Sequence, residues 1–163
     1  MNTLNSVKPG TTLDADIARV CAVVRSVPLA FDLAAYELVE RAFAPKFVSD
    51  YTCVFGGEPM ETTPAELIES WRGLLPGYTA SWHCVSDISA KVDGDTANAS
   101  GFVTAQVWVG EVFWHPRGMY QWQLERVDGR WVITHHKFVI NEESGDRSID
   151  KLAAAKAKQS QPD

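Results

Sequence analysis

The spacing of apolar residues along the chain changes near residue 80. Before that point apolar positions recur every three or four residues, which predicts helices at 12–26, 33–43 and 63–74. Pro28 is expected to end the first helix, because proline disfavours a helical conformation in the residue before it. Thr63, Pro64 and Glu66 have the spacing of a capping box at the start of the third helix.

After residue 80 apolar and polar residues alternate, which is the pattern of half-buried strands. Strands are predicted at 81–92, 96–115, 119–127 and 130–140, with turns at 93–95, 115–118 and 128–129, and a short strand pair within 47–57. Three helices followed by a bent antiparallel meander predict an α+β domain whose helices cover the concave face of the sheet. The open mouth of such a cone is a place where ligand pockets form.

The length of 163 residues fits one domain with its own core. We assign residues 1–11 to a flexible N-terminus, 12–140 to the domain and 141–163 to a polar C-terminal tail. The segment DKLAAAKAK within that tail predicts a short helix with too little apolar surface to dock firmly.

Composition and charge narrow the class of protein. A net charge of −6, with lysines and arginines scattered along the chain, argues against nucleic acid as a partner. No apolar run is long enough for a membrane span, and the N-terminus lacks the pattern of a secretory signal. Three irregularly spaced cysteines predict neither a disulfide framework nor a zinc knuckle. We therefore expect a cytoplasmic protein.

Several segments, taken in order, resemble one known family. They are FD at 31–32, then AFAPKFVSDYT, WHCVSDI, GDTANA and GMYQWQLERVDGRW. Together they resemble the SnoaL-like family of the NTF2-like superfamily, which includes polyketide cyclases, scytalone dehydratase, bile-acid 7α-dehydratase and hexachlorocyclohexane dehydrochlorinase. The resemblance implies an NTF2-like cone and a lyase or isomerase that works without a cofactor. Its expected substrate is an apolar small molecule, aromatic or polycyclic.

In that family a histidine and an aspartate form a proton-transferring dyad, and the matching positions here are His83 and Asp32. Imidazole can accept a proton from carbon, while a carboxylate fixes the imidazole tautomer and stabilises the imidazolium. Two structural alternatives compete with this interpretation. Asp32 can be the N-cap of the helix at 33–43, and His83 can be a core histidine bonded to a backbone carbonyl.

The sequence also departs from the family pattern. Val27 stands where several dehydrating relatives have a tyrosine or lysine, and His136 stands where the dehydrochlorinase has an arginine. We interpret His136 as a second catalytic donor, with Tyr36, Tyr51 and His115 as other groups that can replace the lost function. His115 is otherwise expected in an exposed turn.

A metal site is not expected from these histidines. His135 and His136 are adjacent in a strand, so their side chains point to opposite faces and do not form a chelating pair. The family resemblance likewise implies catalysis without metal.

Aromatic residues are the remaining candidates for substrate contact. Tyr36, Tyr51, Trp82, Trp108 and Tyr120 are assigned to substrate binding, although strand aromatics also serve as core and as subunit interface. Trp131 is expected in the core. The resemblance implies a homodimer or homotrimer. Two rival functions stay open: a non-catalytic ligand-binding or assembly module, and the small subunit of a ring-hydroxylating oxygenase.

Overall fold

The computed structural model of the protein describes residues 12–159. Its elements are α1 (Thr12–Leu33), α2 (Tyr36–Ala42), β1 (Phe43–Asp50), α3 (Thr52–Phe55), β2 (Met60–Thr62), α4 (Pro64–Arg72), the 3₁₀ turn η1 (Leu75–Gly77), β3 (Ala80–Asp93), β4 (Thr96–Val109), β5 (Val112–Val127), β6 (Arg130–Gly145) and α5 (Ile149–Gln159). The predicted capping box at Thr63 and Glu66 starts α4. The expected flexibility of residues 1–11 concerns a segment outside the described residues.

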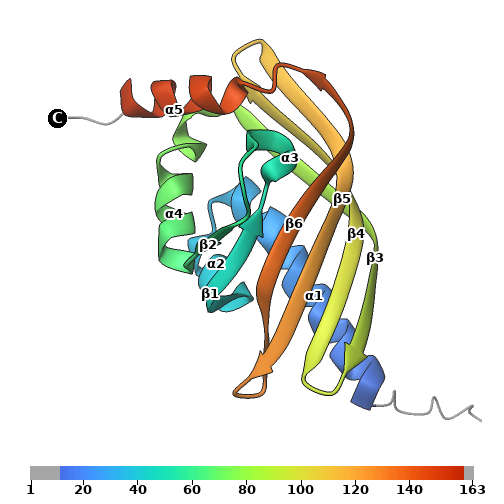
Figure 1. The fold of residues 1–163 in the computed structure, drawn as a ribbon. Helices are drawn as coiled ribbons and strands as arrows, with labels where there is room; N and C mark the ends of the chain where they lie inside the picture. Colours follow the sequence, from blue (N-terminus) through green and yellow to red (C-terminus); the bar gives the residue numbers. More distant parts are fainter. Residues whose placement is uncertain (1–11, 160–163) are drawn as a thin grey trace, which may run out of the picture.

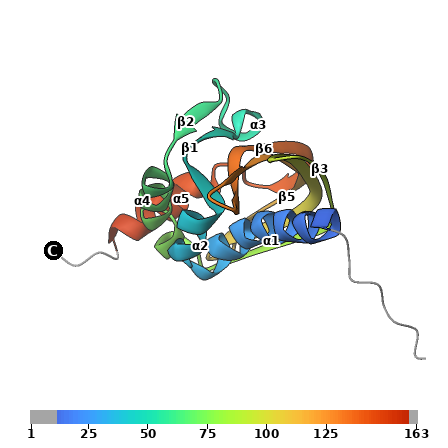
Figure 2. The same cartoon turned by 90° about the horizontal axis from the view of Figure 1, so that it is seen from below.

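One curved sheet of six strands, in the order β2-β1-β6-β5-β4-β3, forms the wall of the fold. β3 to β6 are the predicted antiparallel meander, and β1 joins it by parallel pairing with β6. Figure 1 shows the long strands bending together, and Figure 2 shows α1 lying along the open side of the sheet. The α+β cone is confirmed, with four α-helices rather than three between residue 12 and the meander. No helix within residues 12–159 is long and apolar enough to cross a membrane.

The first helix is longer than predicted because it continues through Pro28. Proline removes one backbone hydrogen bond from a helix and strains the preceding turn. Here Pro28 is buried with Val24 and Val27 on the face that packs in the core, and the Ser26 hydroxyl donates to the Val23 carbonyl at 2.7 Å. Burial of this apolar face outweighs the lost bond, and α1 extends to residue 33.

The hairpin between β4 and β5 turns earlier than predicted. The turn lies at Gly110, whose φ of 61° suits glycine, and residues 115–118 lie inside β5. Pro116 is tolerated there because the β5–β6 register shifts between Arg117 and the next residue, and irregular pairing of this kind admits proline. His115 is therefore a strand residue and not a turn residue; its Nε2 lies 3.3 Å from the side-chain nitrogen of Gln106.

Residues 141–159 of the predicted polar tail form a strand end and a helix. β6 continues past residue 140 to Gly145, and α5 buries Ile149, Ala153 and Ala157 on one face. α5 packs against η1, where a Cβ on Gly77 would lie only 1.8 Å from the carbonyl oxygen of Ala153. The expectation that this helix would not dock firmly is wrong, because alanines at a spacing of four allow close approach to a glycine.

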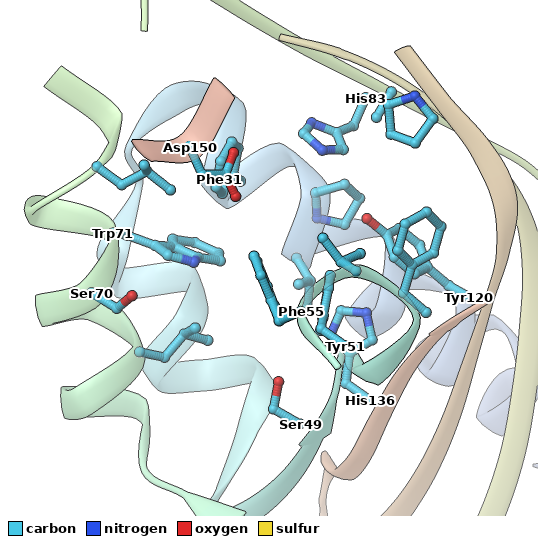
Figure 3. A pocket seen from close by; sticks show the side chains of 18 of the residues that line it. Phe31, Ser49, Tyr51, Phe55, Ser70, Trp71, His83, Tyr120, His136 and Asp150 are labelled. Carbon is cyan, nitrogen blue, oxygen red and sulfur yellow. The ribbon is translucent and has the colours of Figure 1, made fainter. Parts of the chain in front are cut away.

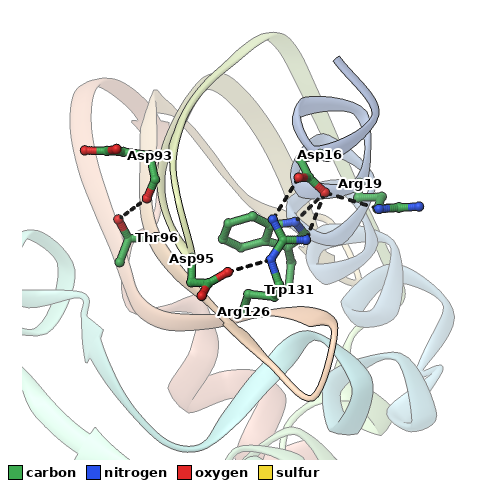
Figure 4. Close-up of polar contacts among 7 residues, drawn as sticks. All are labelled: Asp16, Arg19, Asp93, Asp95, Thr96, Arg126 and Trp131. Carbon is green, nitrogen blue, oxygen red and sulfur yellow. Dashed lines mark hydrogen bonds and ion pairs between the residues drawn. The ribbon is translucent and has the colours of Figure 1, made fainter. Parts of the chain in front are cut away.

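A buried carboxylate joins the start of α1 to the far end of the sheet (Figure 4). Asp16 accepts hydrogen bonds from both terminal nitrogens of Arg126, at 3.0 and 2.7 Å, and from the Trp131 indole at 3.4 Å. The Arg126 guanidinium stacks over the Trp131 ring and also bonds Asp95. Trp131 is buried, as predicted. These contacts fix α1 across the β5–β6 hairpin.

Candidate active site

An apolar cavity of about 430 Å³ lies between the concave face of the sheet and the helices. Its size suits a small organic molecule. No lysine or arginine of residues 12–159 lines it. Side chains in its wall that can transfer a proton come from distant parts of the chain and include Tyr51, Tyr78, His83, Tyr120, His136 and Asp150, all of which except Tyr78 are labelled in Figure 3.

Asp32 and His83 meet beside this cavity. The Nδ1 atom of His83 lies 2.7 Å from Asp32 Oδ1, and both side chains are largely buried. With Nδ1–H donated to the carboxylate, the Nε2 atom of the ring carries the lone pair, and His83 lines the cavity. Neither structural alternative holds: Asp32 lies in the last turn of α1, the N-cap of α2 is Ala35, and the His83 ring bonds a carboxylate.

The Asp32 carboxylate is fixed by two further donors from β3. The Ser81 hydroxyl donates to Oδ1 at 3.0 Å, and the backbone N–H of His83 donates to Oδ2 at 2.7 Å. Burial alone would raise the pKa of Asp32, but the hydrogen bonds that it accepts from the His83 ring, the His83 backbone and Ser81 lower it below its usual value. Asp32 is therefore a carboxylate at neutral pH.

A second group of polar side chains lies deeper among aromatic rings. Burial raises the pKa of Tyr51 and raises that of Tyr120 to about 12, and each of the two tyrosines contributes to the shift of the other. Burial lowers the pKa of His136 to about 3, and its Nε2 has no hydrogen-bond partner within the described residues. Its ring contacts those of Tyr51, Tyr120 and Trp122. These groups are neutral at pH 7, so His136 is not an imidazolium acid.

The wall near α5 contains a phenol–carboxyl pair that the sequence interpretation missed. The Tyr78 hydroxyl donates to Asp150 Oδ1 at 2.5 Å. Burial raises the pKa of Tyr78 well above its usual value, and burial also raises the pKa of Asp150. One signal in the sequence points to this region: Ile149, Ala153 and Ala157 are spaced by four, which indicates a packed helix face beside Asp150.

Three residues assigned to substrate binding do not line the cavity. Trp82 is next to His83 in β3, so its side chain points to the opposite face of the sheet, and it is 49% exposed. Trp108 pairs with Ala80 on that same outer face. Tyr36 begins α2, and the Cζ atom of Arg72 lies over its ring, 5.1 Å from the ring centroid. Tyr51 and Tyr120 do line the cavity, as do Val27 and His136.

The bent sheet and the crossing helix are a fold that this chain shares with solved structures. Residues 14–137 match the SnoaL-like domain, and the chain belongs to that family. No curated protein matches the sequence.

Solved structures share the fold at low sequence identity. The Kfla4162 protein of Kribbella flavida is 20% identical with a TM-score of 0.77, over 86% of this chain and 97% of that chain. A candidate scytalone dehydratase of Novosphingobium aromaticivorans is 15% identical with a TM-score of 0.70, over 81% and 88%. The hexachlorocyclohexane dehydrochlorinase LinA-type3 of Novosphingobium barchaimii is 15% identical with a TM-score of 0.67, over 79% and 88%.

Proposed function

We propose that this protein is a cofactor-independent lyase that eliminates water, or a comparable small leaving group, from a neutral apolar carbonyl compound. The observation that carries the proposal is the 2.7 Å contact between His83 Nδ1 and Asp32 at the wall of an open apolar cavity. A non-catalytic module predicts that these two residues do not meet or that the cone is filled. The contact and the cavity favour the enzyme.

The chemistry begins with proton transfer. His83 Nε2 takes a proton from the carbon next to the substrate carbonyl, and Asp32 stabilises the imidazolium that forms. The Tyr51–Tyr120 pair supplies a hydroxyl donor for the developing enolate oxygen, in surroundings where few other dipoles compete. Loss of a leaving group from the next carbon completes the elimination. With a β,γ-unsaturated ketone that has no leaving group, return of the proton to the γ-carbon of the dienolate shifts the double bond into conjugation.

The lining of the cavity supports a neutral substrate. Carboxylate and phosphate groups are normally bound by arginine or lysine. Within residues 12–159 the cavity wall contains neither, while Glu58 and Asp150 contribute acidic groups. An anionic substrate would lie unpaired in this environment, so ketones and alcohols fit better than acids or phosphate esters.

The test uses 4-hydroxy-4-phenylbutan-2-one, a neutral β-hydroxy ketone, and follows formation of the conjugated enone by absorbance. We expect His83→Ala and Asp32→Asn each to lower kcat/KM by about 10²–10⁴-fold, the usual contribution of a positioned acid–base group. His135→Ala is the matched control, because this exposed histidine lies on the outer face of the sheet. Equal activity of His83→Ala and His135→Ala would overturn the proposal.

A further inference from the structure

Elimination of hydroxide needs an acid as well as a base, because hydroxide is a poor leaving group. The family position that often holds a tyrosine or lysine is Val27 here, an apolar residue of the cavity wall. His136 is neutral and buried, so it does not supply a proton from an imidazolium. The proposed reaction therefore requires another proton donor.

We propose that Asp150 of α5, held by Tyr78, is the general acid that protonates the leaving group. The inference rests on the proposed function and extends it by assigning the second half of the proton transfer. Asp150 and Tyr78 both line the cavity, and the Tyr78 hydroxyl donates to Asp150 Oδ1 at 2.5 Å. Because Oδ1 accepts the hydrogen bond from Tyr78, Oδ2 is the atom that carries the acid proton of Asp150.

The acid and the base lie around the same aromatic ring. The Phe31 ring packs edge-on against the His83 ring, with centroids 5.1 Å apart, and its centroid lies 6.1 Å from that of the Tyr78 ring. Figure 3 shows His83, Phe31 and Asp150 at one end of the cavity, away from the end near Ser49. A small ligand beside Phe31 therefore has a base on one side and an acid on the other.

The environment of Asp150 suits a protonated carboxyl group. Burial raises the pKa of Asp150, and the hydrogen bond from Tyr78 offsets that effect only in part. Asp32 has the opposite surroundings, since donors from Ser81 and His83 keep it ionised. Opposite shifts let two carboxyl groups in one site hold different protonation states, here an acid and the carboxylate that orients the base.

The step balances in atoms and electrons. His83 Nε2 receives the proton from carbon, the C–H electron pair forms the new C=C bond, and the bond from carbon to the hydroxyl oxygen breaks with its electrons on oxygen. The proton of Asp150 Oδ2 joins that oxygen, and water leaves. Solvent then returns one proton to Asp150 and removes one from His83.

The experiment compares two leaving groups in Asp150→Asn. 4-Hydroxy-4-phenylbutan-2-one needs an acid, whereas 4-chloro-4-phenylbutan-2-one releases chloride without one, and both give the same enone. We expect Asp150→Asn to lower kcat/KM for the hydroxy compound by about 10²–10⁴-fold and to leave the chloro compound nearly unchanged. Uncatalysed elimination is subtracted from each rate.

Two further variants keep the test sharp. Tyr78→Phe removes the hydroxyl that donates to Asp150 Oδ1. It should lower kcat/KM for the hydroxy compound by a smaller factor and leave the chloro compound nearly unchanged. This variant also tests the inference if Asp150→Asn does not fold. Asp87→Asn is the matched control: it makes the same change at an exposed residue whose φ of 49° asparagine tolerates.

The outcomes separate this inference from the proposed function. Equal loss with both compounds, or loss with neither, in Asp150→Asn overturns the assignment of Asp150, while a strong effect of His83→Ala on both compounds leaves the proposed function standing. If His83→Ala matches the wild type on both compounds, the proposed function fails and the role of Asp150 fails with it.

Discussion

Trp82 and His83 are adjacent in β3, yet only His83 reaches the cavity, because successive side chains of a strand point to opposite faces. The same rule separates exposed His135 from buried His136 in β6. Once His83 is placed inside, alternation alone assigns Trp82 to the outer face. That consequence can be drawn from the sequence, whereas the position of Trp108 depends on its pairing with Ala80.

At the residue scale, the hydroxyl of Tyr120 is expected to recognise a ligand oxygen, and Trp82 is not expected to touch the ligand. Tyr120→Phe should weaken binding of 4-phenylbut-3-en-2-one, the enone product, by about 1 kcal/mol, or roughly fivefold, because one hydrogen bond is lost. Trp82→Phe should leave the dissociation constant unchanged. Calorimetric titration measures both, and a weaker complex only for Trp82→Phe would contradict this placement.

The sequence predicted the Asp32–His83 contact through family resemblance. The structure adds the hydrogen bonds that hold the Asp32 carboxylate in place. The carboxylate bonds the ring, the backbone N–H of His83 and the Ser81 hydroxyl. The pair of Tyr78 and Asp150 was beyond such an inference, because it lies 72 residues apart in the chain and is brought together only by the docking of α5.

At the element scale, two of the differences between prediction and structure have a common cause. Pro28 indicated a helix end and the composition of the last segment indicated weak docking, since local propensity was the only information available. In the folded chain, burial decided both cases: Pro28 packs inside the core, and Ile149 is fully buried, which contributes about 1.5–3 kcal/mol.

The contact between α5 and Gly77 gives a prediction for this element. Gly77→Ala places a Cβ 1.8 Å from the carbonyl oxygen of Ala153, so α5 must shift, at an expected cost of about 1–3 kcal/mol in unfolding free energy. Hydrogen exchange of the α5 amides should become faster. Gly73→Ala is the control, because its Cβ would lie 3.5 Å from the Ser70 carbonyl oxygen, an ordinary contact. Similar exchange in the two variants would show that α5 does not depend on this contact.

At the scale of the whole molecule, the Asp16 network connects parts of the chain that are 110 and 115 residues apart. It holds the first turns of α1 against the hairpin of β5 and β6 (Figure 4). The Asp16 carboxylate accepts both nitrogens of one guanidinium, a geometry that favours the ionised form strongly.

This network predicts part of the acid sensitivity of the fold. The hydrogen bonds from Arg126, which outweigh burial, lower the pKa of Asp16 from 3.8 to about 2. A lowered pKa in the folded state means that the stabilisation is complete above the usual value and is lost as pH falls from about 4 to about 2. Asp16→Asn should therefore be less stable at pH 7 and should lose less stability across that interval. Urea denaturation at several pH values measures this, and parallel curves for both proteins would contradict it.

The expected homodimer or homotrimer stays a prediction. The outer face of the sheet exposes Trp82 and Phe102 on neighbouring strands, and Phe113 is exposed as well. Sedimentation equilibrium of the purified chain distinguishes a monomer of 18.0 kDa from either assembly.

The position of α5 in the chain sets an order of events during synthesis. Elements made first can fold while later ones are still being added. Asp32 and His83 are translated well before Asp150, so a nascent chain can bring the base and its carboxylate together while one side of the cavity is still missing. The wall of the cavity is complete only when the last described helix has left the ribosome and docked on Gly77.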